Sequence, residues 1–516
     1  MTDRARDDRL AEHRSRVAAA RTSHAPARGT AQPAVAPGVR ECIDTLLDDG
    51  SFVEIGTLAH SDQPAHADST PGDGKVGGHG RIDGRPVTIV ADNPMIKRAS
   101  TATVGAAKVQ RLYEQAERAG NPFIYLGQTG GARIPDALGA RGHSRLDPMA
   151  YLSRRSRSVP LVTAIIGESF GGSSLVSALS DLTIQLRGSC LAITSPLVIS
   201  EATGEEPTFE DLGGVDIHAE RTGQIDLVAE SFDEVADQIR RFLGFLPGNS
   251  WSDPAGSVSV ETDADPGMRD LVPANPRTAY DMRAVVRRLV DGGDFLELRR
   301  RIGTGVLTGL AAIGGASVGV VASQPMRVAG AITPDACDKI VRLLCTCDAY
   351  GLPVVILQDT PGFLVGTGVE HDGLLYKAML LHQAVVLASV PVLAVIVRKS
   401  YGLATACLGG AGMGTDTILA WPDARLGFMD PTVAVRVLYR RELDALDRAD
   451  RDADVAQRAE QLAQDNSVYA AAGVMRVDEV IDPADTRIAV SRRLSVLTGR
   501  RTRDRRSILA SWPTAW

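Results

Sequence analysis

Two stretches of the chain, GNPFIYLGQTGG at residues 120–131 and GLPVVILQDTPG at residues 351–362, follow one pattern. In each stretch a glycine and a proline precede a run of apolar residues, and a turn that contains glycine follows the run. A continuous apolar run of this length between turn residues is typical of a strand that is buried in a parallel sheet. The pattern therefore predicts an equivalent buried strand at two places in the chain.

The same spacing relates other segments on both sides of these strands. VADNPM at residues 90–95 matches VASQPM at 321–326, and SVPLVTAIIGESFGG at 158–172 matches SVPVLAVIVRKSYGL at 389–403. The members of each pair are separated by 231 positions, so the match needs no gap. Self-similarity at a period this long indicates a duplicated domain and not a solenoid of short repeats.

Each half has the same predicted order of elements. A β-hairpin comes first, an amphipathic helix that ends at Gly120 or Gly351 follows, and the buried strand comes next. A glycine-rich turn, a long helical stretch, a second buried strand and a second glycine turn complete the half. Alternating helices and continuous apolar strands predict an α/β fold with right-handed crossovers.

Composition divides the 516 residues into four parts. Residues 1–37 are polar and rich in Pro, Ala and Arg, and beyond a possible first helix we expect them to be mobile. Residues 38–250 and 276–516 are the two repeated domains. Residues 251–275 contain Pro, Gly, Ser and Asp with few apolar side chains, as in a linker.

Charge and hydropathy argue against several classes of protein. The net charge is -7 with both signs interspersed, which disfavours a nucleic-acid partner. No apolar run approaches the roughly 20 residues that span a bilayer, and the N-terminus has no apolar core of a secretory signal, so we expect no membrane partner. The six cysteines are too sparse for a disulfide framework, and a reducing cytoplasm is the expected location.

Metal-binding patterns are absent from the sequence. Cys345 and Cys347 are separated by one residue, unlike the thiol pairs of zinc sites, and they lie in a helical pattern where we expect them to pack in the core. None of the nine histidines forms an HExxH motif or a paired ligand spacing. We therefore expect no metal.

Two glycine turns in each half are candidates for a functional site. They are QTGGARI at residues 128–134 and SFGG at 169–172 in the first half, and QDTPGFL at 358–364 and SYGLA at 400–404 in the second. A glycine turn between a strand and a helix leaves the first N–H groups of the helix unpaired, and such groups suit a developing oxyanion. The alternative is a plain turn in which glycine only relieves backbone strain. Because every half has two turns, we favour one site in each half.

The segment GESFGG at residues 167–172 also fits G-x-S-x-G, the nucleophile elbow of serine hydrolases. A triad with Ser169 would need an acid and a histidine, and Asp181 and His218 follow in a permitted order. However, the duplicated turn repeats the serine as Ser400 in RKSYG, which is no elbow. We therefore interpret the shared serine as a local cap, and a hydrolase remains a less favoured alternative.

The duplicated turns occur in one order with further segments: GGHGRIDGRPV, GGARI, GESFGG, SEATGEEPTFEDLGGVDIHAERTG, TAYDMR, DGGDFLEL, DTPGFLVGT, RKSYG and AWPDARLGFM. This series resembles the carboxyltransferase (β) subunit of biotin-dependent acyl-CoA carboxylases, of the propionyl-CoA and methylcrotonyl-CoA carboxylase β type. The resemblance runs from about residue 38 to about residue 500. It implies two tandem crotonase-like (ClpP/crotonase) domains, the first on the acyl-CoA side and the second on the biotin side, in an enzyme of the transferase or ligase class.

The resemblance also implies a mechanism and its residues. A carboxyl group moves from carboxybiotin to the α-carbon of an acyl-CoA, while backbone N–H groups hold the enolate and the ureido oxyanion. The implied catalytic residues are Gly171 and Gly172 on the thioester oxygen and Gly402, Leu403 and Ala404 toward biotin. The implied substrate-binding residues are Gly130, Gly131, Ala132, Phe170, Gly362, Phe363 and Ala406. Three other residues have ordinary structural explanations. We expect a structural hydrogen bond for His218 and core packing for Trp421. We expect Arg133 to anchor its turn or to contact a CoA phosphate.

Partners follow from the same resemblance. The sequence contains no biotinyl-lysine motif and no ATP-grasp segment, so we expect biotin to be carried by a biotin carboxylase or biotin carrier subunit. In the family each site joins two subunits, which implies a homo-oligomer, a trimer of dimers.

Departures from the family pattern keep alternatives open. YGLATA at residues 401–406 replaces YGGAYD, so Ala406 stands where an acid helps to set the acyl preference. Gly373–Ala378 and Phe428–Asp430 also differ in the second half, and Phe170 replaces a small residue in the first. A decarboxylase or transcarboxylase on the same scaffold, a changed acceptor, and a silent scaffold subunit remain as alternatives.

Overall fold

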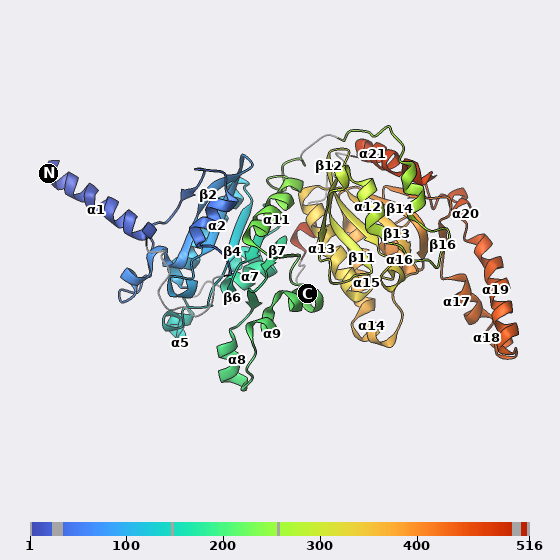
Figure 1. The fold of residues 1–516 in the computed structure, drawn as a ribbon, viewed down its shortest axis with the longest axis horizontal. Helices are drawn as coiled ribbons and strands as arrows, with labels where there is room; N and C mark the ends of the chain where they lie inside the picture. Colours follow the sequence, from blue (N-terminus) through green and yellow to red (C-terminus); the bar gives the residue numbers. More distant parts are fainter. Residues whose placement is uncertain (1–2, 23–34, 146–148, 255–257, 498–506, 513–516) are drawn as a thin grey trace. The chain divides into compact units, whose positions relative to one another are not determined.

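The structure is a computed structural model, and it describes residues 3–22, 35–145, 149–254, 258–497 and 507–512. The described chain forms two compact units, and it passes from the first to the second within residues 244–253 (Figure 1). Of the predicted mobile segment 1–37, residues 3–22 form helix α1, and residues 1–2 and 23–34 lie outside the described part. Residues 255–257 of the predicted linker also lie outside it, whereas Met268 is buried in the core of the second unit.

The first unit is built on a mixed sheet. Its strands follow one another in space as β1 (Val53–Glu54), β2 (Lys75–Ile82), β3 (Arg85–Asp92), β4 (Phe123–Gly127), β5 (Leu161–Ile165), β7 (Leu182–Leu186) and β9 (Leu227–Ala229). The β1–β2–β3 pairs are antiparallel, and every later pair is parallel. Two short strands, β6 (Glu168–Phe170) and β8 (Cys190–Ala192), form a separate parallel pair.

The helices of the first unit connect these strands. They are α1 (Asp3–Thr22), α2 (Val39–Leu46), α3 (Thr103–Ala119), α4 (Ile134–Ala137), α5 (Gly139–His143), α6 (Ala150–Ser153), α7 (Gly172–Ala178), α8 (Pro196–Thr203), α9 (Phe209–Gly213), α10 (Val215–Ile217) and α11 (Phe232–Phe245). The long helical stretch predicted after β4 is wrong, because α4, α5 and α6 are short separate helices there. Helix α4 ends because Leu138 is extended and Gly139 begins the next helix with φ of 72°.

The second unit repeats the sheet. Its strands are, in spatial order, β10 (Phe295–Leu298), β11 (Val306–Ile313), β12 (Ala316–Ser323), β13 (Val354–Thr360), β14 (Val392–Tyr401), β15 (Thr417–Ala420) and β17 (Glu479–Val480), and β16 (Arg425–Gly427) pairs with β14. Its helices are α12 (Met282–Leu289), α13 (Pro334–Tyr350), α14 (Thr367–His371), α15 (Leu374–Leu387), α16 (Leu403–Cys407), α17 (Pro431–Leu438), α18 (Arg440–Asp444), α19 (Arg448–Asp465), α20 (Val468–Gly473) and α21 (Thr486–Leu497).

Strand register confirms that the two α/β domains are copies. Thr88 faces Phe123 across β3 and β4, and Gly319 faces Val354 across β12 and β13. Leu161, the next partner of Phe123, corresponds in the same way to Val392. Each residue pair among β3, β4 and β5 therefore has an equivalent pair 231 positions later among β12, β13 and β14.

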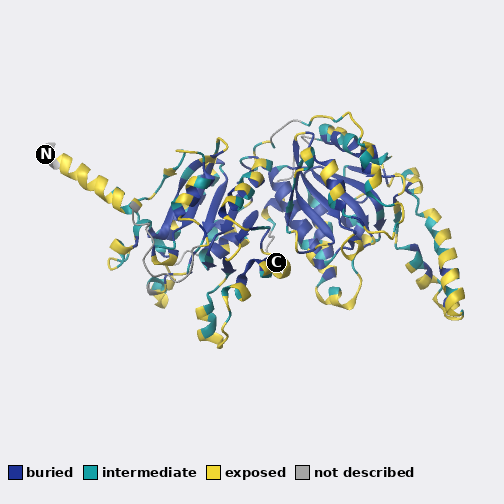
Figure 2. Ribbon diagram, in the orientation of Figure 1, coloured by how far each residue is buried: buried dark blue, intermediate teal, exposed yellow. Residues whose placement is uncertain are grey.

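The cores of both units consist of the strands and the helix that packs on them (Figure 2). Helix α3 buries one face, on which the ring of Tyr113 meets Phe123 edge to face at 5.4 Å. Burial of each such aromatic side chain stabilises the fold by about 1.5–3 kcal/mol. The predicted core role of Cys345 and Cys347 is confirmed, because both thiols are buried in α13.

No helix in the described segments is both long enough and apolar enough to cross a membrane.

Candidate functional site

The first glycine turn of the first unit ends in a free backbone donor. The Thr101 N–H donates to Gly131 O at 2.8 Å, and the Arg133 N–H donates to Thr101 O at 2.8 Å. The turn thus runs parallel to Thr101 on one side. The intervening Ala132 N–H has no hydrogen-bond acceptor among the described residues, and the Ala132 side chain is exposed.

The second glycine turn brings another free donor beside the first. Gly171 adopts a left-handed conformation with φ of 65°, and Gly172 is the first residue of α7, where the fold offers its N–H no intrahelical acceptor. A Cβ on Gly171 would lie 3.5 Å from Gly131 Cα and 3.9 Å from Ala132 N. The two turns are therefore in contact, and their free N–H groups at Ala132 and Gly172 form one candidate site.

The second unit repeats this pair of donors. The Ile332 N–H donates to Gly362 O at 3.0 Å and the Leu364 N–H to Ile332 O at 2.9 Å, which leaves the Phe363 N–H free among the described residues. Leu403 is the first residue of α16, after Gly402 with φ of 67°. Phe363 and Leu403 therefore stand where Ala132 and Gly172 stand in the first unit.

Several glycines predicted at the site use their own N–H groups within the fold. Gly130 donates to Arg98 O at 2.8 Å, Gly171 to Ile193 O at 3.2 Å and Gly402 to Gly427 O at 3.0 Å. Gly131 and Gly362 lie 3.3 and 3.2 Å from the hydroxyl groups of Thr129 and Thr360. These five residues shape the turns, whereas the free donors belong to their neighbours.

Phe170, Ala404 and Ala406, which are also predicted at the site, differ in their burial. Phe170 is buried and stacks on Phe209 with ring centroids 6.2 Å apart, so its side chain packs beneath the turn. Ala404 is the second residue of α16 and is fully buried, and Ala406 is half-buried on the same helix.

A strained turn behind each site is a feature that the sequence did not indicate. Lys97, Arg98 and Ala99 have φ values of 49°, 55° and 50°, in the left-handed region that residues other than glycine rarely adopt. The equivalent Val328, Ala329 and Gly330 have φ values of 43°, 56° and 80°. Carbonyl groups of the first turn accept the Gly130 N–H and, at 2.8 Å, the Thr129 hydroxyl. The repetition of this strain beside both glycine turns points to a functional constraint.

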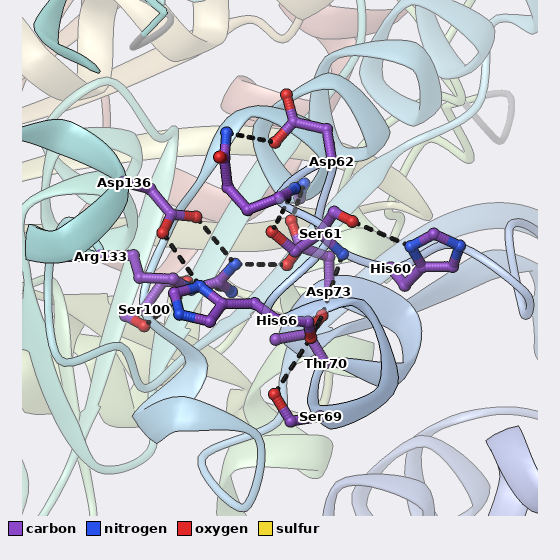
Figure 3. Close-up of polar contacts among 12 residues, drawn as sticks. His60, Ser61, Asp62, His66, Ser69, Thr70, Asp73, Ser100, Arg133 and Asp136 are labelled. Carbon is purple, nitrogen blue, oxygen red and sulfur yellow. Dashed lines mark hydrogen bonds and ion pairs between the residues drawn. The ribbon is translucent and has the colours of Figure 1, made fainter.

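Arg133 anchors the first turn through a buried charge network (Figure 3). Its Nη1 lies 2.8 Å from Asp73 Oδ1 and 3.4 Å from Asp136 Oδ2, and its Nη2 donates to Ser100 O at 3.1 Å. The second oxygen of Asp73 accepts the Gly105 N–H at the start of α3 at 2.6 Å. Asp136 Oδ1 also lies 3.2 Å from His66 Nδ1. These contacts agree with the interpretation of Arg133 as an anchor of its turn, and the side chain is buried.

Buried charges also lie behind the second site. Asp359 Oδ2 accepts hydrogen bonds from the Tyr280 hydroxyl at 2.9 Å and from Arg398 Nε at 3.0 Å. Burial raises the pKa of Asp359 against the opposing effect of Arg398, and burial also raises the pKa of Tyr280. In the first unit Lys75 and Asp92 form a fully buried ion pair, and the Gln128 N–H donates to Asp92 Oδ2 at 3.0 Å.

Exposed apolar side chains flank the second donor pair, and a cavity with apolar and charged lining lies beside it. The side chains of Leu403 and Phe428 are 49% and 82% exposed, and a Cβ on Gly402 would lie 3.3 Å from Phe428 O. A cavity of about 1160 Å³ lies beside these turns, and Pro361, Lys399 and Tyr401 are among the residues that line it.

A serine hydrolase triad does not form. Ser169 is fully buried, and its Oγ lies 2.5 Å from Ser173 Oγ. The His218 ring contacts Leu191 O at 2.6 Å and Thr222 Oγ1 at 2.9 Å, and Asp181 is held by Arg155 at 2.7 Å. The cap interpretation of the serines is wrong too, because neither α7 nor α16 has a side-chain cap and Ser400 instead donates to Gln358 Oε1 at 2.6 Å.

The structural roles predicted for His218 and Trp421 are consistent with the structure. His218 is buried with both ring nitrogens in hydrogen bonds, and burial lowers its pKa. Trp421 lies in the core of the second unit and donates from Nε1 to Thr486 Oγ1 at 2.9 Å. In the described part of the chain, no three His, Cys, Asp or Glu side chains are grouped so as to hold a metal ion.

Comparison with known proteins identifies the family of this chain. The family model described as "Carboxyl transferase domain" matches residues 37–507. The chain belongs to the carboxyl transferase domain family. The family resemblance predicted from the glycine turns is thereby confirmed, and so are the crotonase-like two-domain fold and the assignment as an enzyme.

Individual relatives of the carboxyl transferase family cover nearly the whole chain. The propionyl-CoA carboxylase beta chain of Saccharopolyspora erythraea is 36% identical over 97% of this chain and 93% of its own length. The methylmalonyl-CoA decarboxylase subunit alpha of Veillonella parvula is 34% identical over 90% of each chain. A crystal structure of transcarboxylase 12S, described as a hexamer assembly with methylmalonyl-coenzyme A bound, superposes with a TM-score of 0.86 over 98% of both chains at 32% identity.

Proposed function

We propose that this chain is the carboxyltransferase subunit of a biotin-dependent acyl-CoA carboxylase. The observation that carries the proposal is the repeated donor pair, Ala132 with Gly172 and Phe363 with Leu403, on equivalent turns of two copies of one fold. Two oxyanions take part in carboxyl transfer, one on the thioester and one on the ureido group of biotin. A duplicated domain with one donor pair in each copy suits this requirement.

The first donor pair is assigned to the acyl-CoA thioester. When the α-carbon loses its proton, negative charge develops on the thioester oxygen, and the Ala132 and Gly172 N–H groups stabilise it as an enolate. Fixed donors of this kind contribute roughly 2.7–4 kcal/mol each to the transition state. The positive end of α7 adds to the same effect. Gly130, Gly131 and Gly171 hold the turns in place for this contact.

The second donor pair is assigned to biotin on a partner subunit. The free N–H groups of Phe363 and Leu403 fit a ureido oxygen, and Gly362, Gly402 and Ala404 hold their turns. Biotin, when bound, would supply the carboxyl group and take up the α-proton on its ring nitrogen. The exposed side chains of Leu403 and Phe428 would exclude water from this region.

The reverse direction is the second candidate. Enolate stabilisation serves the removal of a carboxyl group as well as its addition, and the methylmalonyl-CoA decarboxylase subunit alpha is 34% identical to this chain. Ala406, in place of the family's acid, leaves the acceptor open.

One assay separates the two directions. The purified chain is incubated with a biotin carboxylase, its biotinylated carrier, ATP and bicarbonate, and a panel of acetyl-, propionyl-, butyryl- and 3-methylcrotonyl-CoA. We expect a carboxylated thioester by mass spectrometry. Conversion of methylmalonyl-CoA to propionyl-CoA with carrier biotin, without the forward reaction, would favour the decarboxylase. A chain that is inactive in both directions would contradict the proposal.

Assembly and location are part of the proposal. A homohexamer, as a trimer of dimers, is supported by the hexamer assembly of the transcarboxylase 12S relative. We expect the enzyme to act in the cytoplasm with acyl-CoA and a biotin-bearing partner. Light scattering that shows an active monomer would contradict the assembly.

A further inference from the structure

A side-chain hydroxyl group lies beside the two backbone donors of the first unit. A Cβ on Gly172 would lie 3.2 Å from Thr101 Oγ1 and 4.0 Å from Thr101 Cβ, so the hydroxyl is adjacent to the first residue of α7. Two backbone hydrogen bonds of 2.8 Å tie Thr101 to the residues on either side of Ala132. Thr101 therefore touches both turns that carry the free N–H groups.

The Thr101 hydroxyl makes no hydrogen bond within the described part of the fold. The neighbouring Ser100 Oγ faces Arg133 Nε at 3.4 Å, whereas Thr101 Oγ1 has no hydrogen-bond partner among the described residues. Thr101 is half-buried, so solvent and a substrate reach the residue. A threonine hydroxyl rotates freely about its C–O bond and donates one hydrogen bond to an oxygen that arrives beside it.

The duplicated fold provides an internal comparison. The residue equivalent to Thr101 in the second unit is Ile332, which makes the same two backbone bonds to its turn and is fully buried. The backbone of the turn therefore forms without a hydroxyl at this position. The polar group is confined to the unit that we assign to the acyl-CoA thioester.

From these contacts we infer that Thr101 is a third hydrogen-bond donor to the thioester oxygen, acting with the Ala132 and Gly172 N–H groups. The inference rests on the proposed function of the first unit. As the thioester becomes an enolate, the oxygen gains charge, and a donor at this place strengthens its hydrogen bond in the transition state. The alternative is that the Thr101 hydroxyl only binds water and takes no part in the reaction.

The network of Arg133 would keep this donor in place. Arg133 Nη2 donates to the carbonyl of Ser100, directly before Thr101. Asp73 accepts the N–H of Gly105 in the first turn of α3, four residues after Thr101. The segment from Ser100 to Gly105 is thus fixed on both sides of the hydroxyl. A fixed donor costs little reorganisation when charge develops.

The test uses the full chain with its biotin-bearing partner and the acyl-CoA of the panel that the parent carboxylates fastest. Thr101→Val removes the hydroxyl and keeps the shape of the side chain, and Thr101→Ser keeps the hydroxyl. Thr103→Val is the matched control, because Thr103 is also half-buried and lies two residues away on α3. We expect Thr101→Val to lower kcat about 10²-fold with KM within about threefold, while Thr101→Ser and Thr103→Val stay within about threefold of the parent.

Other outcomes overturn the inference. A kcat of Thr101→Val within about threefold of the parent, a rise in KM alone, or an equal loss in Thr101→Ser would each show that the hydroxyl is not a donor in the transition state. If Thr101→Val does not fold by circular dichroism, Thr101→Ala is compared with Thr101→Ser, and equal rates would contradict the inference. A parent with no carboxyl transfer in either direction refutes the proposed function itself, and the role of Thr101 is then refuted with it.

Discussion

Ala132 and Phe363 occupy the same place in two copies of one turn. Ala132 lies opposite Thr101 and Phe363 lies opposite Ile332 in parallel bridges, and each has a backbone N–H without an acceptor in the described structure. The two side chains share no chemistry, since one is a methyl group and the other an aromatic ring. What the duplication retains is the backbone donor, as the proposed role of the N–H groups requires.

Ser169 gives the first prediction. Because its hydroxyl is buried against Ser173 and no histidine hydrogen-bonds to it, Ser169→Ala should keep carboxyl transfer within about tenfold of the parent, a barrier change near 1.4 kcal/mol. Steady-state kinetics measure the change, and a fluorophosphonate probe should leave Ser169 unlabelled. Covalent labelling of Ser169, or a loss of several orders of magnitude in the rate of Ser169→Ala, would favour the serine hydrolase hypothesis instead.

Asp73 gives a prediction about stability. Asp73→Asn removes the closest partner of a buried guanidinium, because Asp73 Oδ1 lies 2.8 Å from Arg133 Nη1. Breaking a buried pair on one side costs about 3–5 kcal/mol of unfolding free energy. Urea denaturation of the variant measures the loss.

The control for this prediction is a surface pair. Asp62 Oδ2 lies 3.9 Å from Arg145 Nη1, and the two side chains are 40% and 52% exposed. Asp62→Asn should therefore change the unfolding free energy by about 1 kcal/mol or less. Equal effects of Asp73→Asn and Asp62→Asn would contradict the role given to the buried network.

The sequence predicted the fold well and the donors only in part. The repeat at 231 residues and the apolar strands are local signals, so the two α/β domains followed from them. The identity of the free donors depends on distant partners: Ile193 O and Gly427 O accept the N–H groups of Gly171 and Gly402. No spacing within the glycine turns reveals those acceptors. For the same reason the sequence marked Arg133 and not its partner Asp73, which lies 60 residues earlier.

Lys339 gives a prediction about pH. Its Nζ donates to Ile302 O at 3.1 Å and to Val306 O at 2.8 Å, and burial lowers the pKa of Lys339 to about 7. Between this value and the ordinary pKa of about 10.4, the unfolded chain binds a proton that the folded chain does not bind. Protonation of the unfolded state therefore makes the native protein less stable as the pH falls from about 10 toward 7.

Lys339→Met removes this pH dependence. Relative to the parent, the variant should gain unfolding free energy as the pH falls from 9.5 to 7.5, by ~1.4 kcal/mol for each pH unit. The lost hydrogen bonds to Ile302 O and Val306 O shift the variant by the same amount at every pH. Denaturation at the two pH values measures the difference, and a constant gap between variant and parent would show that Lys339 is charged in the folded state.

The two donor pairs give the last prediction. Gly172 and Leu403 are each the first residue of a helix, where proline is tolerated because its missing N–H has no intrahelical acceptor. Gly172→Pro and Leu403→Pro therefore remove one free donor each with little damage to the fold. Gly172→Ala and Leu403→Ala are the controls, because alanine keeps the N–H group. At Gly172 both variants place a Cβ about 3.2 Å from Thr101 Oγ1, so the comparison between them isolates the lost N–H group.

Each proline variant should lower kcat about 10²–10³-fold relative to its alanine control, the effect of one lost donor. The two should differ in what they disturb. If the second unit holds biotin, Leu403→Pro should still be stabilised by an acyl-CoA in a thermal melt as strongly as Leu403→Ala, because the thioester pair is intact. Circular dichroism and sizing first establish that the variants fold and assemble. If Leu403→Pro transfers carboxyl groups at the rate of Leu403→Ala, the second donor pair does not act on biotin, and the departures at Leu403, Ala406 and Phe428 then mark a unit that has lost that chemistry.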